Sequence, residues 1–365
     1  MKVIMTGGGT GGHIYPAIAI AEKIKEQHKD AEILFVGTER GLEKDLVPKN
    51  GYPIKFITVS GFNRKNLLKN VKVVKELLQG SKEARKIIKE FKPDVVIGTG
   101  GYVCGPVVRA AHKLGVKTFI HEQNAYPGVT NKMLEKYVDN VFISFDEARA
   151  YFKEDKKIVF SGNPVRKSFF NTDKMTAKEN IGEKSSDFSV LCFGGSRGAK
   201  KINDVMLDVV ENLNGVKDTS VHFVTGSLYY DDILKELESR GFANKGNIHI
   251  NKYIDNMQDY LGAADLVISR SGALTVSEIT VCGKASVLIP SPNVTGNHQY
   301  HNAKAIADKG GAVILEEKDL TAETLMYIIS DLKNDAAKLE KMEVASKACA
   351  PKDATQIIYD NLKLS

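Results

Sequence analysis

The sequence contains one pattern twice: a short apolar run leads into a glycine-rich loop, which leads into a helix. The first run covers residues 3–5 and precedes the loop at 7–12; the second covers 189–193 and precedes the loop at 194–198. Strands that alternate with helices build parallel sheets covered on both faces. The doubled pattern therefore predicts an α/β fold of two Rossmann-like, doubly wound domains that face a shared cleft.

Further runs with strand or helix character follow each copy of the pattern. In the first half, strands are predicted at residues 33–36, 54–58, 95–97, 118–121, 140–144 and 157–161. In the second half, they are predicted at residues 221–225, 248–251, 266–269, 285–289 and 312–315. Helices are predicted at residues 16–28, 67–91, 105–114 and from 322 onward. A polar stretch that begins at residue 161 carries little strand signal, so we place the interdomain linker there.

The composition is that of a globular protein with an uneven charge distribution. Hydrophobic residues make up 42% and charged residues 26% of the 365-residue chain, as in proteins with well-formed cores. No apolar run is long enough for a signal peptide or a membrane span, so we expect a cytosolic protein. The formal net charge is +6, yet residues 64–92 alone contain ten Lys and Arg against three Glu. This local excess predicts an anionic partner.

The loop at residues 7–12, GGGTGG, contains the GxGxxG pattern directly after a strand and before a helix. Glycines let the backbone approach a phosphate closely, and a helix N-terminus supplies free N–H groups and a favourable dipole. A dinucleotide site would require an acidic residue at the end of the second strand, but Val36 ends it and Glu39 comes late. We therefore favour a phosphate site over an NAD site; the alternative is a tight turn without a ligand.

His13 follows this loop at the entrance of the predicted helix. A cation is disfavoured at a helix N-terminus, so the imidazole should stay largely neutral. A neutral imidazole beside a phosphate-binding loop is a candidate general base or hydrogen-bond donor. The alternative is a histidine that only caps or packs the helix.

Two further glycine-rich loops follow predicted strands, at residues 98–106 and 194–198. Three such loops at the carboxyl ends of parallel strands indicate the edge at which doubly wound folds bind ligands. The HEQN sequence at 121–124 also follows a strand, although a hydrogen-bonded turn would explain it by itself. In GNPVR, residues 162–166, Arg166 is either a surface charge or a cation placed for a diphosphate.

The most informative stretch is SRSGALTVSE at residues 269–278. A buried strand ends there in small polar residues and opens a helix whose N-terminal N–H groups can hold a phosphate. Glu278 lies one turn into this helix and is either a ligand of a ribose diol or a favourable carboxylate near a helix start. The chain contains no Asp-x-Asp pair, which metal-dependent nucleotide-sugar enzymes often use, so we expect neither a metal nor a cofactor.

Together, these motifs resemble those of the MurG family, the N-acetylglucosaminyltransferases that make lipid II in peptidoglycan synthesis. The resemblance rests on GGGTGGHIYP (7–16), HEQN (121–124), GNPVR (162–166), GGSRGA (194–199), SRSGALTVSE (269–278) and the polar residues 299–303. The motifs occur in the family's order and cover essentially the whole chain. One departure is Arg197, where the family usually has Gln; we expect this extra charge near the donor diphosphate.

The resemblance implies the GT-B architecture. We expect an N-terminal domain at 1–163 on the acceptor and membrane side and a C-terminal UDP-GlcNAc-binding domain at 164–340. A C-terminal helix at about 341–365 should pack back on the first domain. The family contacts its donor through residues that correspond to Thr10, Gly11, Gly12, Asn124, Arg166, Ser196, Ile254, Ala273, Leu274, Thr275, Glu278 and Gln299. Among these, the backbone of Ile254 would contact uracil, and Glu278 the ribose.

The activity that the resemblance implies is transfer of GlcNAc, with inversion and without a metal. The donor is UDP-GlcNAc, and the acceptor is the MurNAc 4-hydroxyl of undecaprenyl-pyrophosphoryl-MurNAc-pentapeptide (lipid I). We expect His13 to take the acceptor proton, while helix N-termini and Arg166 stabilise the departing diphosphate. The alternatives are another GT-B-like UDP-GlcNAc enzyme such as a 2-epimerase, an NAD-dependent oxidoreductase, and a non-catalytic sugar-nucleotide-binding protein.

A polyprenyl acceptor requires the first domain to approach a bilayer. The basic residues between 64 and 92 are interspersed with apolar residues at helical spacing, most of which should face the domain core. We expect an anionic membrane surface, and no nucleic acid, as a partner, and a peripheral location on the cytoplasmic side of the cell membrane. The alternative is an ordinary amphipathic helix with its basic residues in water.

Overall fold

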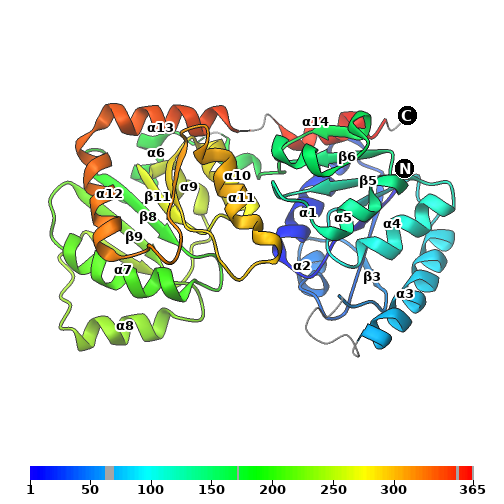
Figure 1. Cartoon of the computed structure of the whole chain (residues 1–365), viewed down its shortest axis with the longest axis horizontal. Helices are drawn as coiled ribbons and strands as arrows, with labels where there is room; N and C mark the ends of the chain where they lie inside the picture. Colours follow the sequence, from blue (N-terminus) through cyan, green and yellow to red (C-terminus); the bar gives the residue numbers. More distant parts are fainter. Residues whose placement is uncertain (62–69, 171, 351–352, 364–365) are drawn as a thin grey trace. The chain divides into compact units, whose positions relative to one another are not determined.

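A computed structural model describes residues 1–61, 70–170, 172–350 and 353–363. The chain divides into two compact units. Unit 1 comprises Met1–Val165 together with Pro351–Ser365, and unit 2 comprises Arg166–Ala350. In Figure 1, unit 1 runs from blue through cyan to green and includes the red helix at the C-terminus, while unit 2 continues from green to orange-red.

Unit 1 is built on a parallel sheet. In the described part of the chain its strand order is β3-β2-β1-β4-β5-β6-β7. The strands are β1 (Lys2–Thr6), β2 (Glu32–Gly37), β3 (Ile54–Phe56), β4 (Val95–Gly98), β5 (Lys117–Glu122), β6 (Asn140–Ile143) and β7 (Ile158–Phe160). The strand order reverses its direction at β1, so the loops after β1 and β4 flank the switch point at which doubly wound folds bind ligands.

Helices cover both faces of this sheet because residues along each strand alternate in direction. Ile4 packs in a core formed with α3 and α4, whereas its neighbours Val3 and Met5 pack in a second core with α1 and α14. The unit's helices are α1 (Gly11–Gln27), α2 (Glu43–Lys49), α3 (Asn70–Phe91), α4 (Cys104–Lys113), α5 (Val129–Leu134) and α14 (Ala354–Asn361). Among its described residues the unit also contains the short 3₁₀ turns η2 (Glu135–Tyr137), η3 (Asp146–Tyr151) and η4 (Asp155–Lys157).

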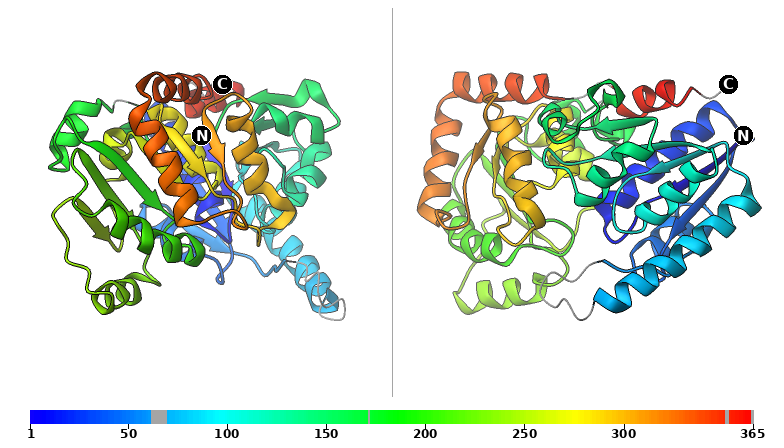
Figure 2. Two further views of the ribbon diagram at one scale, coloured as in Figure 1. Left: turned by 60° about the vertical axis from the view of Figure 1, so that its left-hand side comes forward. Right: turned by 45° about the vertical axis from the view of Figure 1, so that its right-hand side comes forward.

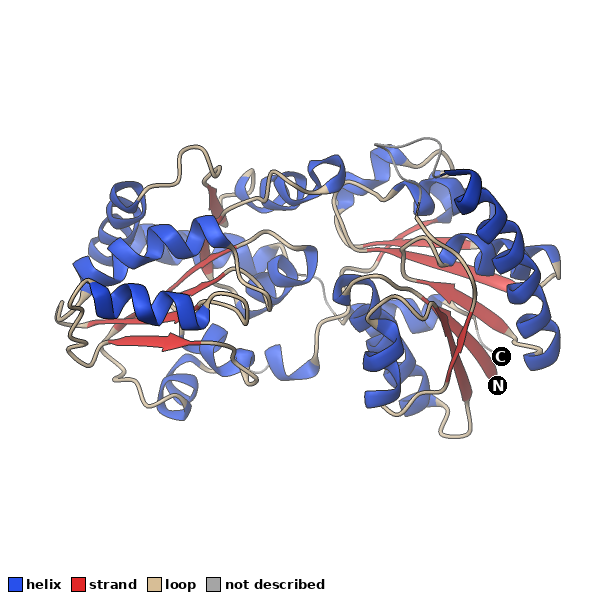
Figure 3. Cartoon of the chain, turned by 90° about the horizontal axis from the view of Figure 1, so that it is seen from below, coloured by secondary structure: helices blue, strands red, loops and turns tan. Residues whose placement is uncertain are grey.

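Unit 2 repeats this architecture around a second parallel sheet, which Figure 3 shows with red strands between blue helices. Its strand order, within the described residues, is β10-β9-β8-β11-β12-β13. The strands are β8 (Phe188–Phe193), β9 (Thr219–Val224), β10 (Ile248–Asn251), β11 (Leu266–Ser269), β12 (Ala285–Leu288) and β13 (Ala312–Ile314). All of the predicted strands are therefore confirmed.

The helices of unit 2 also lie on both faces of its sheet (Figure 2). Helices α7, α8 and α12 contribute to one core with the apolar residues of β8 and β9. The helices are α6 (Lys174–Asn180), α7 (Lys200–Leu213), α8 (Tyr230–Ser239), α9 (Met257–Ala263), α10 (Ala273–Cys282), α11 (His298–Ala307), α12 (Ala322–Asn334) and α13 (Ala336–Ala348). Two 3₁₀ turns are η5 (Lys167–Phe169) and η6 (Thr295–Asn297).

Two helix predictions differ from the structure. The first helix is predicted at residues 16–28 from the spacing of its apolar residues, yet α1 begins at Gly11, with Pro16 inside it. The predicted single helix at 341–365 is two helices. α13 packs on α10, α12 and β12 of unit 2, and α14 belongs to unit 1, where the Tyr359 hydroxyl lies 2.7 Å from His28 Nε2.

The unit boundaries also differ slightly from the predicted ones. Unit 2 begins at Arg166 rather than at 164, and it extends to Ala350 rather than to 340. The later end reflects α13, whose Lys347 donates a hydrogen bond to the carbonyl of Val281 at the end of α10.

Candidate active site

In unit 1, two of the predicted glycine-rich loops contact each other at the carboxyl ends of neighbouring strands. The backbone N–H of Gly8 donates to the Gly100 carbonyl at 3.3 Å. The hydroxyl of Thr99 donates to the carbonyl of His13 at 2.7 Å. A Cβ atom at Gly101 would lie 2.6 Å from the Gly8 carbonyl oxygen, so only glycine permits this approach. The loop after β1 is thus fixed against the loop after β4.

Because α1 begins at Gly11, His13 lies in the first turn of the helix rather than ahead of it. Its Nδ1 lies 3.0 Å from the carbonyl oxygen of Gly8. A carbonyl can only accept, so Nδ1 carries the proton in this contact and, in the neutral ring, Nε2 keeps its lone pair. The imidazole is partly buried and packs on Gly100, where a Cβ atom would lie 2.8 Å from the ring. This tautomer is the one that a general base acting through Nε2 requires.

Thr10, Gly11 and Gly12 form the open end of α1. Thr10 is the N-cap, with extended backbone angles and no side-chain capping bond, and its side chain is exposed. The first turn itself contains no acidic residue that would neutralise the positive end of the helix dipole. The arrangement can therefore accept an anionic or strongly polar group.

The HEQN sequence lies at the end of β5. It is largely a hydrogen-bonded turn, which the sequence suggested as the alternative to a ligand-binding motif. Buried Glu122 accepts bonds from the backbone N–H groups of Asn124 and Gly128, both at 3.0 Å. Burial lowers the pKa of His121 to about 4, although its bond to the Gly162 carbonyl raises it in part. The amide of Gln123 donates to the Thr99 carbonyl at 2.8 Å. These residues support the loop after β4, while partly exposed Asn124 has its side-chain amide on Glu122.

In unit 2, the loop after β11 opens helix α10 as predicted. Gly272 is the N-cap with extended backbone angles, and Ala273, Leu274 and Thr275 form the first turn without an acidic residue. Among the described residues, the buried hydroxyl of Ser271 has no hydrogen-bond partner. The first turn of α10 therefore offers a helix N-terminus next to an unsatisfied polar group, an arrangement suited to a phosphate.

Glu278 lies in the second turn of α10. Desolvation by the surrounding protein raises the pKa of its carboxyl group to about 7, and the nearby positive charge of Arg166 lowers it in part. The exposed guanidinium of Arg166 lies 5.0 Å from the centre of the Phe169 ring. The structure thus brings Arg166 and Glu278 into electrostatic contact within unit 2. Carboxylates with such raised pKa values are characteristic of functional sites.

The loop after β8 presents its side chains to solvent. Ser196 and Arg197 are exposed, and the Ser196 carbonyl accepts a hydrogen bond from the N–H of Ser227 at 3.2 Å. A Cβ atom at Gly198 would lie 2.1 Å from the Thr225 carbonyl oxygen, so this loop rests on the loop after β9.

Two predicted donor contacts lie after other strands of the same sheet. Ile254, buried, follows β10, and Gln299 lies in the first turn of α11, where its side-chain oxygen accepts from the N–H of Ser291 at 2.9 Å. Carboxyl ends of parallel strands lie at one edge of a sheet. The sheet of unit 2 therefore places these residues at the same edge as Ser196 and the start of α10.

Two residues that sequence reasoning missed organise these loops. Glu43 is buried beneath the loop after β1 and accepts from the N–H of Gly9 at 2.9 Å. Arg270 pairs with Glu317 and donates to the carbonyls of Ile289 and Pro290 at 3.2 Å, which ties the ends of β11 and β12 together. Both act across distant parts of the chain, so no local spacing marks them.

Comparison with known proteins shows which class of enzyme has these two domains. The glycosyltransferase family 28 N-terminal domain matches residues 3–143, and the corresponding C-terminal domain matches residues 189–358. A putative UDP-N-acetylglucosamine 2-epimerase from Listeria monocytogenes shares the fold, with a TM-score of 0.71 at 16% identity over 99% of this chain and 95% of that one. The two matched domains define a glycosyltransferase with the GT-B fold.

Two proteins with higher sequence identity show which family of glycosyltransferases the chain belongs to. A crystal structure of Acinetobacter baumannii MurG covers 99% of both chains with a TM-score of 0.80 and 29% identity. A protein from Bacillus cytotoxicus is 47% identical over 363 residues, 100% of this chain and 99% of that protein. Its name is UDP-N-acetylglucosamine--N-acetylmuramyl-(pentapeptide) pyrophosphoryl-undecaprenol N-acetylglucosamine transferase. The chain belongs to this family of N-acetylglucosaminyltransferases, the MurG family.

Proposed function

We propose that the protein transfers GlcNAc from UDP-GlcNAc to the MurNAc 4-hydroxyl of undecaprenyl-pyrophosphoryl-MurNAc-pentapeptide, which yields lipid II for peptidoglycan synthesis. The observation that carries the proposal is the 47% identity, over the whole length of both proteins, with the Bacillus cytotoxicus transferase. The 2-epimerase alternative rests on 16% identity, which supports a common fold and no common reaction. No relative described above favours an NAD-dependent oxidoreductase.

The donor, in this proposal, binds at the edge of the unit 2 sheet. The first turn of α10, at Ala273, Leu274 and Thr275, faces the diphosphate with its N–H groups and positive dipole end. Glu278 accepts hydrogen bonds from the ribose hydroxyls, and Arg166, close to it, supplies positive charge for the leaving group. Further donor contacts come from the Ile254 backbone, Ser196 and Gln299.

His13 acts as the general base. Its Nδ1–H is engaged by the Gly8 carbonyl, so Nε2 can take the proton of the acceptor hydroxyl as that oxygen attacks the anomeric carbon. The bond between that carbon and the UDP oxygen breaks in the same displacement, and the donor site stabilises the departing diphosphate. The resemblance adds Thr10, Gly11, Gly12 and Asn124 of unit 1 as further contacts of the donor.

The deciding experiment incubates the full chain with labelled UDP-GlcNAc and a lipid I analogue, followed by identification of the products. We expect a disaccharide product with inverted configuration, and none in reactions that lack the acceptor. UDP-ManNAc formed without an acceptor would instead identify an epimerase. Activity should survive EDTA, because helix N-termini and Arg166 are proposed to stabilise the diphosphate without a metal ion. A loss of activity in EDTA that magnesium or manganese restores would contradict this.

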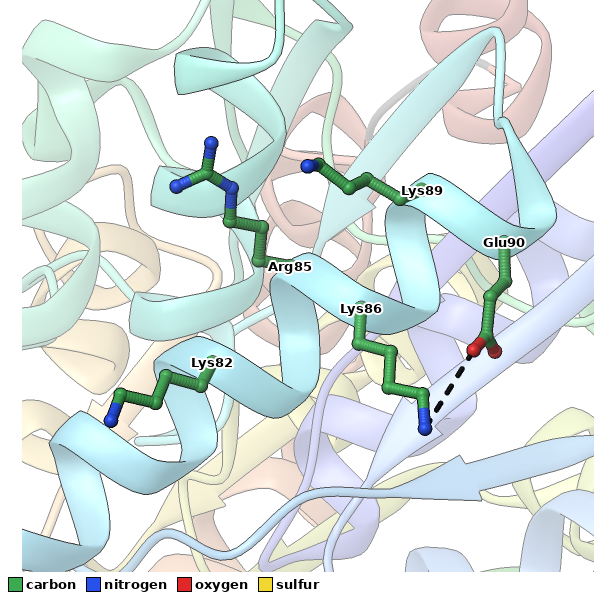
Figure 4. Close-up of a pocket in the computed structure, with 5 residues that line it drawn as sticks. All are labelled: Lys82, Arg85, Lys86, Lys89 and Glu90. Atoms are coloured by element: carbon green, nitrogen blue, oxygen red, sulfur yellow. Dashed lines mark ion pairs between the residues drawn. The ribbon is translucent and has the colours of Figure 1, made fainter.

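We also propose that unit 1 docks on an anionic membrane surface through α3. Lys82, Arg85, Lys86 and Lys89 line a shallow hollow on successive turns of this helix, where Glu90 pairs with Lys86 at 3.9 Å (Figure 4). Each basic residue near an anionic leaflet contributes about 1 kcal/mol to binding. The location expected from this proposal is peripheral, on the cytoplasmic side of the cell membrane.

The apolar residues of α3 divide between the core and this surface. Ala84, Ile87 and Ile88 are buried in unit 1, whereas Val74 and Leu78 are 46% and 63% exposed and share the helix face of the basic residues. Residues 62–69, which include Leu67, Leu68 and Lys69 of the predicted segment, lie outside the described residues. Within the described part of the chain, no helix combines the length and the apolar character that a membrane span needs.

A further inference from the structure

The reaction proposed above gives no role to Glu43, a buried carboxylate of unit 1 that lies beneath the loop after β1. Glu43, the first residue of α2, is 1% exposed. Its Oε2 accepts from the N–H of Gly9 at 2.9 Å, and its Oε1 accepts from the N–H and the hydroxyl of Thr38 at 2.9 and 2.7 Å. These bonds compensate the burial of the carboxylate. Glu43 therefore links the residue after β2 to the glycine loop after β1.

Three glycines make room for the Glu43 side chain. A Cβ atom at Gly8 would lie 2.5 Å from Oε1, one at Gly37 would lie 2.5 Å from Cγ, and one at Gly41 would lie 1.9 Å from Oε2. No side-chain carbon can approach so closely, so a larger residue at any of the three would displace Glu43. The glycine loop at residues 7–12, whose sequence matches a phosphate-binding pattern, thus also makes room for the Glu43 carboxylate.

The same peptide unit connects Glu43 to His13. The Gly9 N–H that binds Glu43 and the Gly8 carbonyl that accepts from His13 Nδ1 belong to one planar peptide group. Hydrogen bonds at the two ends of a peptide group strengthen each other. Fixing the N–H end therefore also fixes the orientation of the carbonyl that selects the His13 tautomer.

We propose that Glu43 is a positioning residue for glycosyl transfer. By holding the Gly8–Gly9 peptide, it keeps the proton of neutral His13 on Nδ1 and leaves Nε2 able to accept. Glu43 is buried and both of its carboxylate oxygens are bound to Gly9 and Thr38, so we place its effect on the reaction through the histidine. This inference rests on the general-base role proposed for His13.

The variant Glu43→Gln removes this function with little change in volume. Its side chain has one acceptor oxygen and an NH₂ group, so it cannot accept from Gly9 and Thr38 with two oxygens as the carboxylate does. Glu135→Gln is the matched control. Glu135 is also buried in unit 1, but its Oε1 alone accepts from the N–H groups of Lys153 and Glu154, which an amide oxygen can replace.

Two measurements on the full chain test the proposal. Steady-state kinetics should show kcat reduced by about 10²-fold in Glu43→Gln, with the KM for UDP-GlcNAc unchanged, as expected for a misplaced catalytic group. Two-bond ¹⁵N–¹H NMR spectra, with His13 assigned from a His13→Gln variant, should show the Nδ1–H tautomer in the parent and a tautomer mixture in Glu43→Gln. Glu135→Gln should match the parent in both.

An unchanged His13 tautomer in folded Glu43→Gln would overturn the proposal, and so would an equal loss of kcat in Glu135→Gln. If Glu43→Gln does not fold, Glu43→Asp retains the charge but withdraws the carboxylate from Gly9, and the same tautomer shift is expected. Failure of the base assignment is separable. Normal turnover of His13→Ala would refute the general base, whereas the NMR result reports on Glu43 alone.

Discussion

The two units begin with the same strand, glycine loop and helix, but their loops are held differently. In unit 1, the loop after β1 is fixed on both sides, by Glu43 from the β2 side and by Gly100 and Gly101 from the β4 side. In unit 2, the loop after β8 rests on the loop after β9, where Gly198 meets Thr225.

The helix that follows each glycine loop also differs between the two units, at its third residue. In α1 it is His13, partly exposed and hydrogen bonded to its own loop; in α7 it is Ile202, which is fully buried. In the reaction proposed above, a rigid loop suits unit 1, because that unit has to orient His13 as the base. An open loop, with Ser196 and Arg197 exposed, suits a unit that surrounds a ligand. One sequence pattern thus serves two kinds of site.

The largest effect should come from the side chain that distinguishes the two loops. His13→Ala is expected to lower turnover roughly 10²–10⁴-fold, the contribution typical of a general base. Calorimetry should find UDP affinity unchanged, because His13 is proposed to act on the acceptor and most of the proposed donor contacts lie on unit 2. His112→Ala, a change of another histidine in unit 1, serves as the control. Near-normal turnover in His13→Ala would make His13 a packing residue and remove the contrast between the loops.

The next effect should appear in unit 2. Glu278→Ala should weaken UDP-GlcNAc binding by roughly 1–3 kcal/mol through loss of charge-assisted hydrogen bonds from the ribose. The carboxyl pKa of about 7 gives the sign of the pH dependence: protonation removes an acceptor, so affinity falls as pH drops through 7. Glu278→Gln should abolish this dependence. Unchanged calorimetric affinity in folded Glu278→Ala would place the ribose elsewhere.

A smaller difference between the units should appear at membranes. Changing Lys82, Arg85, Lys86 and Lys89 together to Gln should reduce the affinity for anionic vesicles at low salt by at least about tenfold. A basic residue close to the lipid surface contributes about 1 kcal/mol, so contacts by only two of the four would be enough for this factor. The matched control changes four exposed lysines of unit 2 to Gln: Lys200, Lys304, Lys318 and Lys338. Equal binding of both variants would show that α3 is not the docking face.

The smallest effect concerns the open loop itself. Arg197→Gln, which introduces the residue usual in the family, should raise the KM for UDP-GlcNAc by only a few-fold, because an exposed cation contributes about 0–1 kcal/mol. The kcat should not change. A Lys201→Gln variant, on the adjoining turn of α7, controls for the loss of one charge. An unaltered KM would mean that the Arg197 side chain does not reach the diphosphate.

The sequence predicted the strands well because buried parallel strands are short apolar runs with sharp ends. Helix starts were less predictable. The apolar spacing predicted a helix from Pro16, whereas Gly11 and Gly12 are already helical, which no propensity scale favours. The sequence also did not predict that the C-terminal segment divides into α13 and α14, because this division depends on which unit each helix packs against.

In the candidate site, prediction from the sequence placed the loops and helix starts whose contacts are local, while the roles of their residues stay predictions. The positions of the glycine loops and of the start of α10 follow from patterns of neighbouring residues, and His13 comes directly after its loop in the sequence. It failed for Glu43, which contacts Gly9 from 34 positions away, and for Arg270, whose partner Glu317 lies 47 positions on. Such residues are identifiable only once the sheet has brought their elements together.

The placement of α14 has a consequence for how the chain acquires its structure. Ile358 and Leu362 are fully buried in the same core as Val3 and Met5, although all of unit 2 lies between them in the sequence. Burial of each such side chain contributes about 1.5–3 kcal/mol. During synthesis on the ribosome, the residues of unit 2 therefore emerge before the core of unit 1 can close. The half that is translated first is the half that is completed last.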